Sequence, residues 1–174
     1  YVRKSFYKHY VDGLRYVEAK DEQYIQQYVY DIINDPECFT EEQSIDSSWW
    51  KENNKAYTYA LDMTKKEVYQ AAEGMYHNLN TLQSRSGNQL PFTSINYGTC
   101  TEPEGRMVTK AILDVSIKGI GKLHKTSIFP CGIFQCMKGV NRKPGDPNYD
   151  LFQLALKSTA KRLYPNYANV DWSG

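Results

Sequence analysis

From residue 66 onward, helical and strand patterns alternate along the chain, and this alternation limits the folds that it can adopt. Apolar residues at steps of three and four predict a helix over 68–82, and alternation with period two predicts a strand over 91–97. The patterns that follow are a helix from Thr101 to Gly119, a strand region over 128–140, a helix opening at Asp146 and a short strand over 167–172. Such an order is typical of an α/β fold, in which crossover helices pack on a sheet of parallel strands.

The first third of the chain carries helical patterns only. One helix face is formed by Phe6, Tyr10, Leu14 and Val17. A second helical pattern covers 25–33 and ends before Asp35-Pro36, because the residue before a proline avoids helical torsions. We therefore expect two parts, a helical region over 1–65 and an α/β part over 66–174.

Local signals predict where two helices begin and which residues they bury. Thr101 and Glu104 have the spacing of a capping box, and Asp146-Pro147 offers an N-cap followed by a proline in the first turn. The residues expected to face the core are Val108, Ile112 and Val115 in the first helix and Leu151, Leu154, Ala155 and Ser158 in the second. The seam of Val68, Ala72, Met75, Leu79 and Leu82 is expected to be core or a dimer interface.

The charge balance excludes several function classes. The chain has 21 Lys and Arg against 20 Asp and Glu, a net charge of +1, which argues against a nucleic-acid or membrane-surface binder. No apolar run approaches the roughly 20 residues that span a bilayer, and the first residues lack the order of a signal peptide. We expect a cytoplasmic protein that binds neither nucleic acid nor membrane.

The cysteines predict neither disulfides nor a metal site. The four thiols, Cys38, Cys100, Cys131 and Cys136, include no C-x-x-C pair, and the three histidines are scattered. Cys131 and Cys136 lie five apart, so they cannot face the same way on a regular strand, and we interpret them as small buried residues.

Two groups of polar residues are candidates for ligand contact. Ser94 and Asn96 share one strand face and, buried, would need partners such as a nucleotide's phosphates or ribose; the alternative is that they bond neighbouring strands. The segment 139–145 places Asn141, Arg142 and Lys143 between glycines at a strand's carboxyl end, where ligands bind in α/β folds; the alternative is a solvated surface turn.

Arginine and tryptophan residues give weaker signals. Arg106 lies in the first turn of a helix, where its charge opposes the helix dipole, so an anionic partner is expected, a phosphate or Glu102; the alternative is a surface arginine. Trp50 and Lys51 could stack on a base and hold a triphosphate, or the tryptophan pair 49–50 could anchor a loop onto helices.

Three stretches of the chain resemble the catalytic subunit of the anaerobic, class III ribonucleotide reductases of the glycyl radical family. They are Asn78–Gly98, Glu104–Arg106, and Gly145–Phe152 with Ala160–Asn166. The resemblance covers over half of the chain and extends to the phage type, while residues 1–65 match only as a variable helical region. One departure is Cys100, where we expect the family to carry Asp.

The resemblance implies a fold and a chemistry. The fold is part of the ten-stranded α/β barrel of ribonucleotide reductases and glycyl radical enzymes. The activity is the conversion of ribonucleoside triphosphates to deoxyribonucleotides for DNA synthesis, with formate as reductant and nucleoside triphosphates as allosteric effectors. A radical S-adenosylmethionine activase would be a partner, the enzyme would be a homodimer, and the loop over 139–145 would relay effector identity to substrate choice.

The resemblance also implies that the catalytic groups lie elsewhere. The radical cysteine, the glycyl radical and a zinc site are expected outside these 174 residues, so no residue of this chain is expected to be catalytic and the chain is expected to be an incomplete piece. The competing interpretation is a non-catalytic nucleotide-binding or helical interaction module derived from the same fold.

Overall fold

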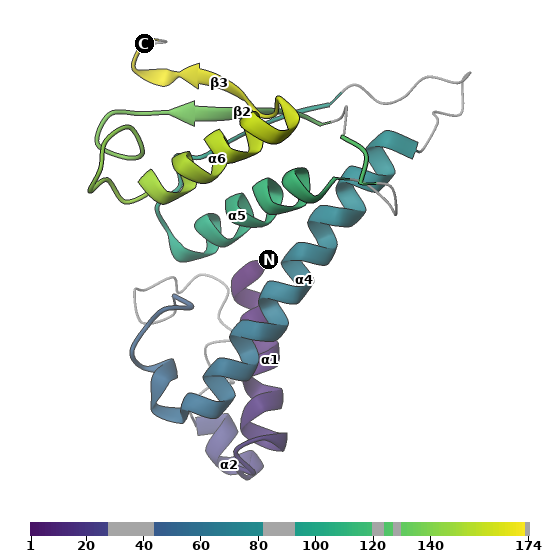
Figure 1. Ribbon diagram of the computed structural model, residues 1–174. Coiled ribbons are helices and arrows are strands. Elements are labelled where there is room, and N and C mark those ends of the chain that lie inside the picture. Colours follow the sequence, from purple (N-terminus) through teal and green to yellow (C-terminus); the bar gives the residue numbers. More distant parts are fainter. Residues whose placement is uncertain (28–43, 82–92, 120–123, 127–129, 173–174) are drawn as a thin grey trace. The chain divides into compact units, whose positions relative to one another are not determined.

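The computed structural model describes residues 1–27, 44–81, 93–119, 124–126 and 130–172 (Figure 1). The chain forms two compact units, Tyr1–Val68 and Tyr69–Gly174. The boundary falls inside the long helix α4 (Asn54–Thr81), so this helix contributes its first half to one unit and its second half to the other.

Aromatic side chains form the core of the first unit. Its elements are α1 (Val2–Tyr16), α2 (Glu22–Ile25), the 3-10 helix η3 (Trp50–Asn53) and the first part of α4. Phe6 and Trp50 are fully buried and meet edge to face, with ring centroids 5.4 Å apart. The rings of Tyr7 and Tyr10 also contact the Trp50 indole. Tyr7 and Tyr10 thus belong to the aromatic core of this unit.

The helix predictions for the first unit are mostly confirmed. Phe6, Tyr10 and Leu14 are buried on α1 as expected. The prediction that Val17 belongs to the same helix face is wrong, because Val17 follows the helix as its C-cap and is 43% exposed. The second predicted helix begins as α2, three residues earlier than expected, and residues 28–33 of its range lie outside the described residues.

One carboxylate joins α1 to α4 within the first unit. Glu67 accepts a hydrogen bond from the Ser5 hydroxyl on one oxygen, and its other oxygen lies 2.7 Å from Nε2 of the buried His9. These two hydrogen bonds hold the pKa of Glu67 below its usual value, and the bond from Ser5 has the larger effect.

The second unit is a parallel sheet with helices on one face. The strand order is β1 (Ser94–Tyr97), β2 (Cys131–Cys136), β3 (Asn166–Asn169), and both neighbouring pairs are parallel. Helices α5 (Pro103–Lys118) and α6 (Tyr149–Arg162) are the crossovers and lie against the same side of the sheet (Figure 1). The α/β class and the parallel strands are therefore confirmed, while the ten-stranded barrel stays a prediction.

The core of the second unit lies between the sheet and these helices. Its buried centre consists of Leu113, Phe134, Leu151 and Ala155, against which Tyr97, Cys136, Phe152 and Leu154 pack. The four core positions predicted for α6 are thus confirmed, with Ser158 fully buried and hydrogen bonded to Ser116 of α5. On α5, the prediction that Val108 faces the core is wrong, because Val108 is 37% exposed, whereas Ile112 and Val115 are buried as predicted.

Both predicted helix starts are displaced by one or two residues. Helix α5 has Glu102 as its N-cap, with Pro103 in the first turn, and Glu102 makes no side-chain capping bond. Helix α6 has Asn148 as its N-cap, because Asp146 accepts backbone hydrogen bonds from the loop that precedes it. Thr101 and Asp146 are therefore not the N-caps of these helices, and both predictions are wrong.

A pair of buried tyrosines links α4 to the chain after α6 within the second unit. The hydroxyls of Tyr76 and Tyr164 lie 2.9 Å apart, and that of Tyr164 also donates to the carbonyl of Pro130. Burial raises the pKa of both hydroxyls, so they stay neutral. The seam predicted on α4 is shifted: Val68 and Ala72 are buried, but Tyr76 rather than Met75 is the fully buried residue of the next turn.

Gly132 gives the first prediction. A Cβ atom at Gly132 would meet the hydroxyl of Tyr164, whereas a Cβ atom at Gly74 in α4 would meet nothing within 4 Å. We expect Gly132→Ala to lower the free energy of unfolding by about 1–3 kcal/mol through overpacking. Gly74→Ala should raise it by about 0.5–1 kcal/mol, because alanine is the better helix former. Denaturant unfolding of the full-length protein measures both, and equal effects would contradict the tight approach at Gly132.

Glu67 gives a second prediction, on pH. Its pKa is lowered in the folded state, so the ionised carboxylate contributes stability above its ordinary value of 4.5. That stability is lost as the pH falls through the folded pKa. The difference in unfolding free energy between the wild type and Glu67→Gln should therefore be constant near neutral pH and shrink below about pH 4.5. A difference that stays constant down to pH 3 would contradict the two hydrogen bonds.

Candidate functional site

The carboxyl ends of β1 and β2 lead into the segments that form the candidate site. β1 is followed by Gly98, whose φ of +113° favours glycine, and β2 leads into the loop from Met137 to Asn148. Gly139 and Gly145 also have positive φ, of +79° and +92°, so the glycines that frame this loop take torsions that other residues avoid. The loop lies at the edge of the sheet where ligands bind in α/β folds.

Two fully buried asparagines hold this loop from inside. The Nδ2 group of Asn141 donates to the carbonyls of Gly98 (3.0 Å) and Gln135 (2.7 Å), and its Oδ1 accepts from the Met137 amide. The Nδ2 group of Asn148 donates to Gly98 (3.1 Å) and Cys100 (2.7 Å). Each amide N–H is used, so the donor that Asn141 was expected to offer a base edge or phosphate is spent within the protein. Its role here is structural.

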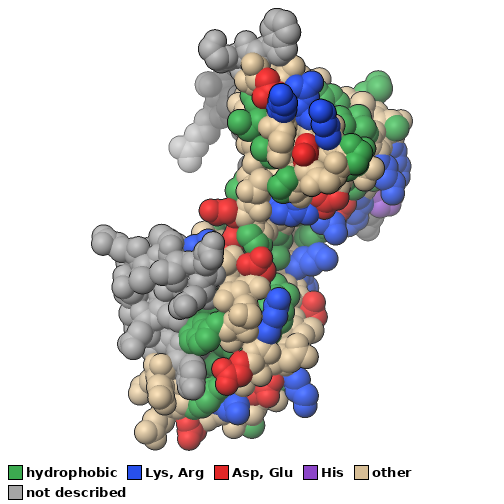
Figure 2. Space-filling model, turned by 90° about the vertical axis from the view of Figure 1, so that its left-hand side faces the viewer, with side chains coloured by type: hydrophobic (Ala, Val, Ile, Leu, Met, Phe, Trp, Pro, Cys, Tyr) green, Lys and Arg blue, Asp and Glu red, His purple; other side chains and the backbone are tan. Residues whose placement is uncertain are grey.

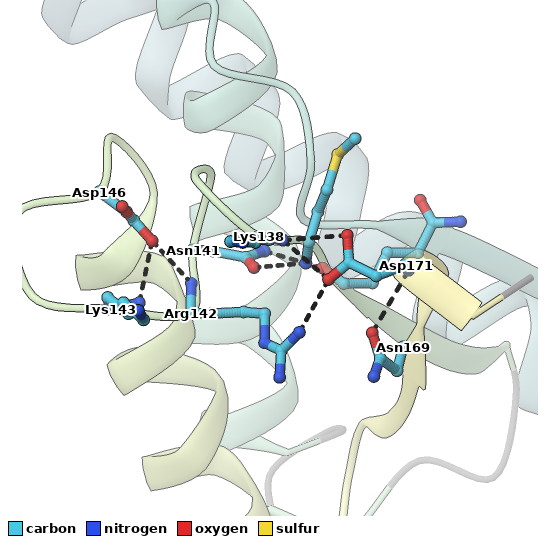
Figure 3. A network of polar contacts seen from close by, with 9 residues as sticks. Lys138, Asn141, Arg142, Lys143, Asp146, Asn169 and Asp171 are labelled. Atoms are coloured by element: carbon cyan, nitrogen blue, oxygen red, sulfur yellow. Dashed lines mark hydrogen bonds and ion pairs between the residues drawn. The ribbon is translucent and has the colours of Figure 1, made fainter.

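Two carboxylates hold the loop from outside (Figure 3). Asp146 accepts from the backbone amides of Arg142 (3.1 Å) and Lys143 (2.9 Å), which closes the turn. Asp171, in the 3-10 helix η4 (Val170–Trp172) after β3, accepts from the Lys138 amide and pairs with Nη1 of Arg142 at 2.8 Å. The loop is therefore fixed at its middle as well as at its ends.

The exposed side of the loop is cationic. Lys138, Arg142 and Lys143 line an open pocket of about 300 Å³. Of the two predicted cations, the guanidinium of Arg142 is 44% exposed and Lys143 is exposed. In Figure 2, basic side chains gather in the upper part of the molecule, with acidic side chains beside them. The structure thus brings two predicted residues together with Lys138, which sequence reasoning did not select.

Arg106 has an anionic partner, as expected, and this partner is the carboxylate of Asp150. Its Nη2 lies 2.6 Å from Oδ2 of Asp150, and its Nη1 donates to Oδ1 of Asn148 and to the carbonyl of Pro147. Arg106 therefore ties the start of α5 to the start of α6. This guanidinium positions the buried Asn148, and the phosphate expected beside it is not needed to explain its place in the helix.

Ser94 and Asn96 share one face of β1, as the pattern predicted, and this face lies opposite to α5 and α6. The expectation that they are buried is wrong. Both are exposed, while Tyr97 packs on the core side against Phe134. In the parallel register their neighbours on β2 are Cys131 and Ile133, so this face is mixed polar and apolar. Contact of Ser94 and Asn96 with substrate stays a prediction.

The cysteines of β2 point to opposite faces of the strand. Cys136 packs against the core, and Cys131 lies in register with the exposed Ser94. Both are half-buried rather than fully buried, so that part of the interpretation is wrong. Burial raises the pKa of the Cys136 thiol, which keeps it protonated.

The prediction that Trp50 stacks on an effector base is wrong. Trp50 is fully buried among aromatic rings, and its indole N–H donates to the carbonyl of Ser44 at 2.9 Å. It therefore anchors a loop onto helices, which was the alternative. Lys51 is exposed, with its ammonium 5.9 Å from the centre of the Tyr57 ring, and its proposed role stays a prediction.

Sequence reasoning missed Asn148, Asp150 and Asp171. A signal for Asp171 was present, because it follows a third strand whose carboxyl end meets the same sheet edge as the loop. Over the described ranges, no group of three metal-ligating side chains occurs. Among the helices in those ranges, none has the length and apolar character needed to cross a bilayer.

Comparison with known proteins identifies relatives over most of the chain. The family model described as anaerobic ribonucleoside-triphosphate reductase matches residues 4–173. Proteins of that name from Haemophilus influenzae and Escherichia coli are each 42% identical over 113 residues, which is 65% of this chain and 16% of theirs. That of Enterobacteria phage T4 is 45% identical over 111 residues, 64% of this chain and 18% of its own. The chain thus spans less than a fifth of the length of these curated relatives.

The buried amides give a third prediction. Asn141→Ala removes three hydrogen bonds: the Gln135 carbonyl and the Met137 amide lose this partner, and the Gly98 carbonyl keeps only Asn148. We therefore expect a loss of about 2–4 kcal/mol in unfolding free energy. Arg142→Ala in the same loop breaks only an exposed ion pair and should cost less than about 1 kcal/mol. Chemical denaturation of the full-length variants measures both. A cost for Asn141→Ala no larger than that for Arg142→Ala would contradict the internal anchoring of the loop.

Proposed function

The chain belongs to the family of anaerobic ribonucleoside-triphosphate reductases, and we propose that the full-length protein reduces ribonucleoside triphosphates to deoxyribonucleotides for DNA synthesis. The observation that carries this proposal is the match of the family model to residues 4–173. In the reaction, the 2′ C–O bond of the ribose breaks, the oxygen leaves as water, and formate is oxidised to carbon dioxide as it supplies two electrons and the hydrogen.

The bare face of the sheet is the part of this chain that we assign to substrate. The exposed side chains of Ser94 and Asn96 offer a hydroxyl and an amide on one strand, two residues apart. Groups of this kind can hydrogen bond to a ribose or a phosphate without titrating near neutral pH. The opposite face is closed by the helices, so a ligand of this sheet would lie against the Ser94 side.

The loop from Met137 to Asn148 is the part that we assign to specificity. Arg142 and Lys143 present their charges to solvent, while the buried Asn141 fixes the backbone that carries them. A fixed backbone with exposed cations suits a relay that changes by side-chain rearrangement rather than by reshaping of the whole loop. Arg106 then contributes by holding the start of α6, which follows the loop.

We place the catalytic groups in other parts of the full-length protein. A glycyl radical would supply one-electron chemistry, and a zinc site would lie in a separate segment. The partners of the proposal are a second copy of the chain, a radical S-adenosylmethionine activase and nucleoside triphosphate effectors, all in the cytoplasm. Lys51, the exposed cation of the first unit, stays a candidate effector contact.

The proposed activity is tested with the full-length protein under anaerobic conditions, with an activase and formate. Deoxyribonucleotide formed from each ribonucleoside triphosphate is measured by chromatography. Formation that depends on both activase and formate supports the reductase. Nucleotide binding without any product would favour the non-catalytic module instead.

Arg142 gives a fourth prediction, on specificity. If the loop relays the effector, Arg142→Ala should change the ranking of the four ribonucleotides, because coupling is a difference between states. Activity without effector should fall less than the response to effector. Lys157→Ala, an exposed cation on α6 away from the loop, is the matched control. Unchanged ratios among the four substrates would leave the loop a surface turn.

A further inference from the structure

The pairing of Arg142 with Asp171 stands apart from the other contacts of the loop. Asn141 and Asp146 bind backbone groups, whereas Asp171 also binds a side chain that lines the pocket. In Figure 3 the guanidinium of Arg142 reaches across to the carboxylate, and the Asp171 amide is itself bonded to Asn169. Asp171 therefore holds one wall of the pocket in a defined place.

The other two cations of the pocket are not neutralised in this way. Among the residues that the structure describes, no carboxylate forms an ion pair with the ammonium of Lys138 or Lys143. Three cations thus line a pocket of about 300 Å³, and Asp146, the other carboxylate that binds this loop, is directed to backbone amides. The pocket has room and charge for an anion of several oxygens.

The Arg142–Asp171 pair is also weak enough to be exchanged. Both side chains are partly open to solvent, 44% and 28% exposed, and exposed ion pairs contribute little net stability. A guanidinium binds a phosphate by the same parallel N–H bonds as a carboxylate, and a triphosphate brings more charge than one Asp. An incoming polyphosphate can therefore replace Asp171 on Arg142 at small cost.

We propose that the pocket lined by Lys138, Arg142 and Lys143 binds a polyphosphate group, and that Asp171 occupies Arg142 until that group replaces it. Asp171 is then a positioning residue, which lowers the affinity of the empty pocket for anions. The inference deepens the proposed function, since the nucleoside triphosphates of that function carry such a group. The pocket and the ion pair that support it are both observed in this structure.

The fifth prediction tests Asp171 with inorganic triphosphate as the probe. In the full-length protein, Asp171→Asn keeps an acceptor for the Lys138 amide but loses the charge that holds Arg142. We expect triphosphate binding, measured by calorimetry, to tighten roughly three- to tenfold. In an Arg142→Ala background the same substitution should have almost no effect, because there is no guanidinium to release. Lys157→Ala should leave binding unchanged.

Two results would overturn the inference. One is a wild type and an Asp171→Asn variant that both fail to bind triphosphate. The other is a tightening that is as large in the Arg142→Ala background, which would make it a general effect of charge. Asp171→Ser, which keeps a hydroxyl acceptor, replaces Asp171→Asn if that variant does not fold. Comparison of inorganic triphosphate, a nucleoside triphosphate and the bare nucleoside shows whether the phosphates alone suffice.

Failure of this inference is distinguishable from failure of the proposed function. If the protein reduces ribonucleotides but Asp171 and Arg142 show no coupling in triphosphate binding, the proposed exchange is wrong and the proposed function stands. If the coupling is seen in triphosphate binding but no deoxyribonucleotide forms, the polyphosphate pocket stands and the proposed reductase function is wrong.

Discussion

The carbonyl oxygen of Gly98 accepts hydrogen bonds from the side chains of Asn141 and Asn148, and the carboxyl end of the sheet is organised around it. Because both amides are fully buried, an unmet hydrogen bond there would carry the whole cost of desolvation. The strand end, the loop and the first residue before α6 are therefore constrained together. Arg106 extends the same network by donating to the side chain of Asn148. Its guanidinium therefore holds the buried amide in place in addition to forming an ion pair.

This internal anchoring separates two tasks within one short loop. Backbone position depends on buried neutral amides, which bind no ligand. The exposed charges of Arg142 and Lys143 can change partners without loss of that frame, because their backbone amides are held by Asp146. A loop that contributes to specificity therefore need not be a mobile one.

The sequence predicted the order of elements well, because periodicity reports burial directly. The helices of the second unit, its parallel strands and the core positions of α6 all follow from spacing and from the crossover rule. Helix starts were less predictable, since Asp146 and Asn148 are both good N-caps and only tertiary contacts decide between them.

The roles of single polar residues were the hardest to predict. Asn141 reads as an exposed donor in a polar loop, yet it is fully buried and hydrogen bonds to the backbone of Gly98, Gln135 and Met137. Trp50 reads as a stacking surface, yet Phe6, Tyr7 and Tyr10 enclose it. In both cases the deciding partners lie on other elements, so local pattern could not supply them.

The pairing of Arg142 with Asp171 also bears on how this surface can evolve. The two residues lie 29 positions apart in sequence but form an ion pair, one from the loop after β2 and the other from the segment after β3. A chain that lost the arginine would keep an acidic group beside Lys138 and Lys143 with nothing to occupy it, and the pocket would become less attractive to anions. A substitution at one of the two positions therefore favours a substitution at the other. In related sequences the two charges should be gained and lost together.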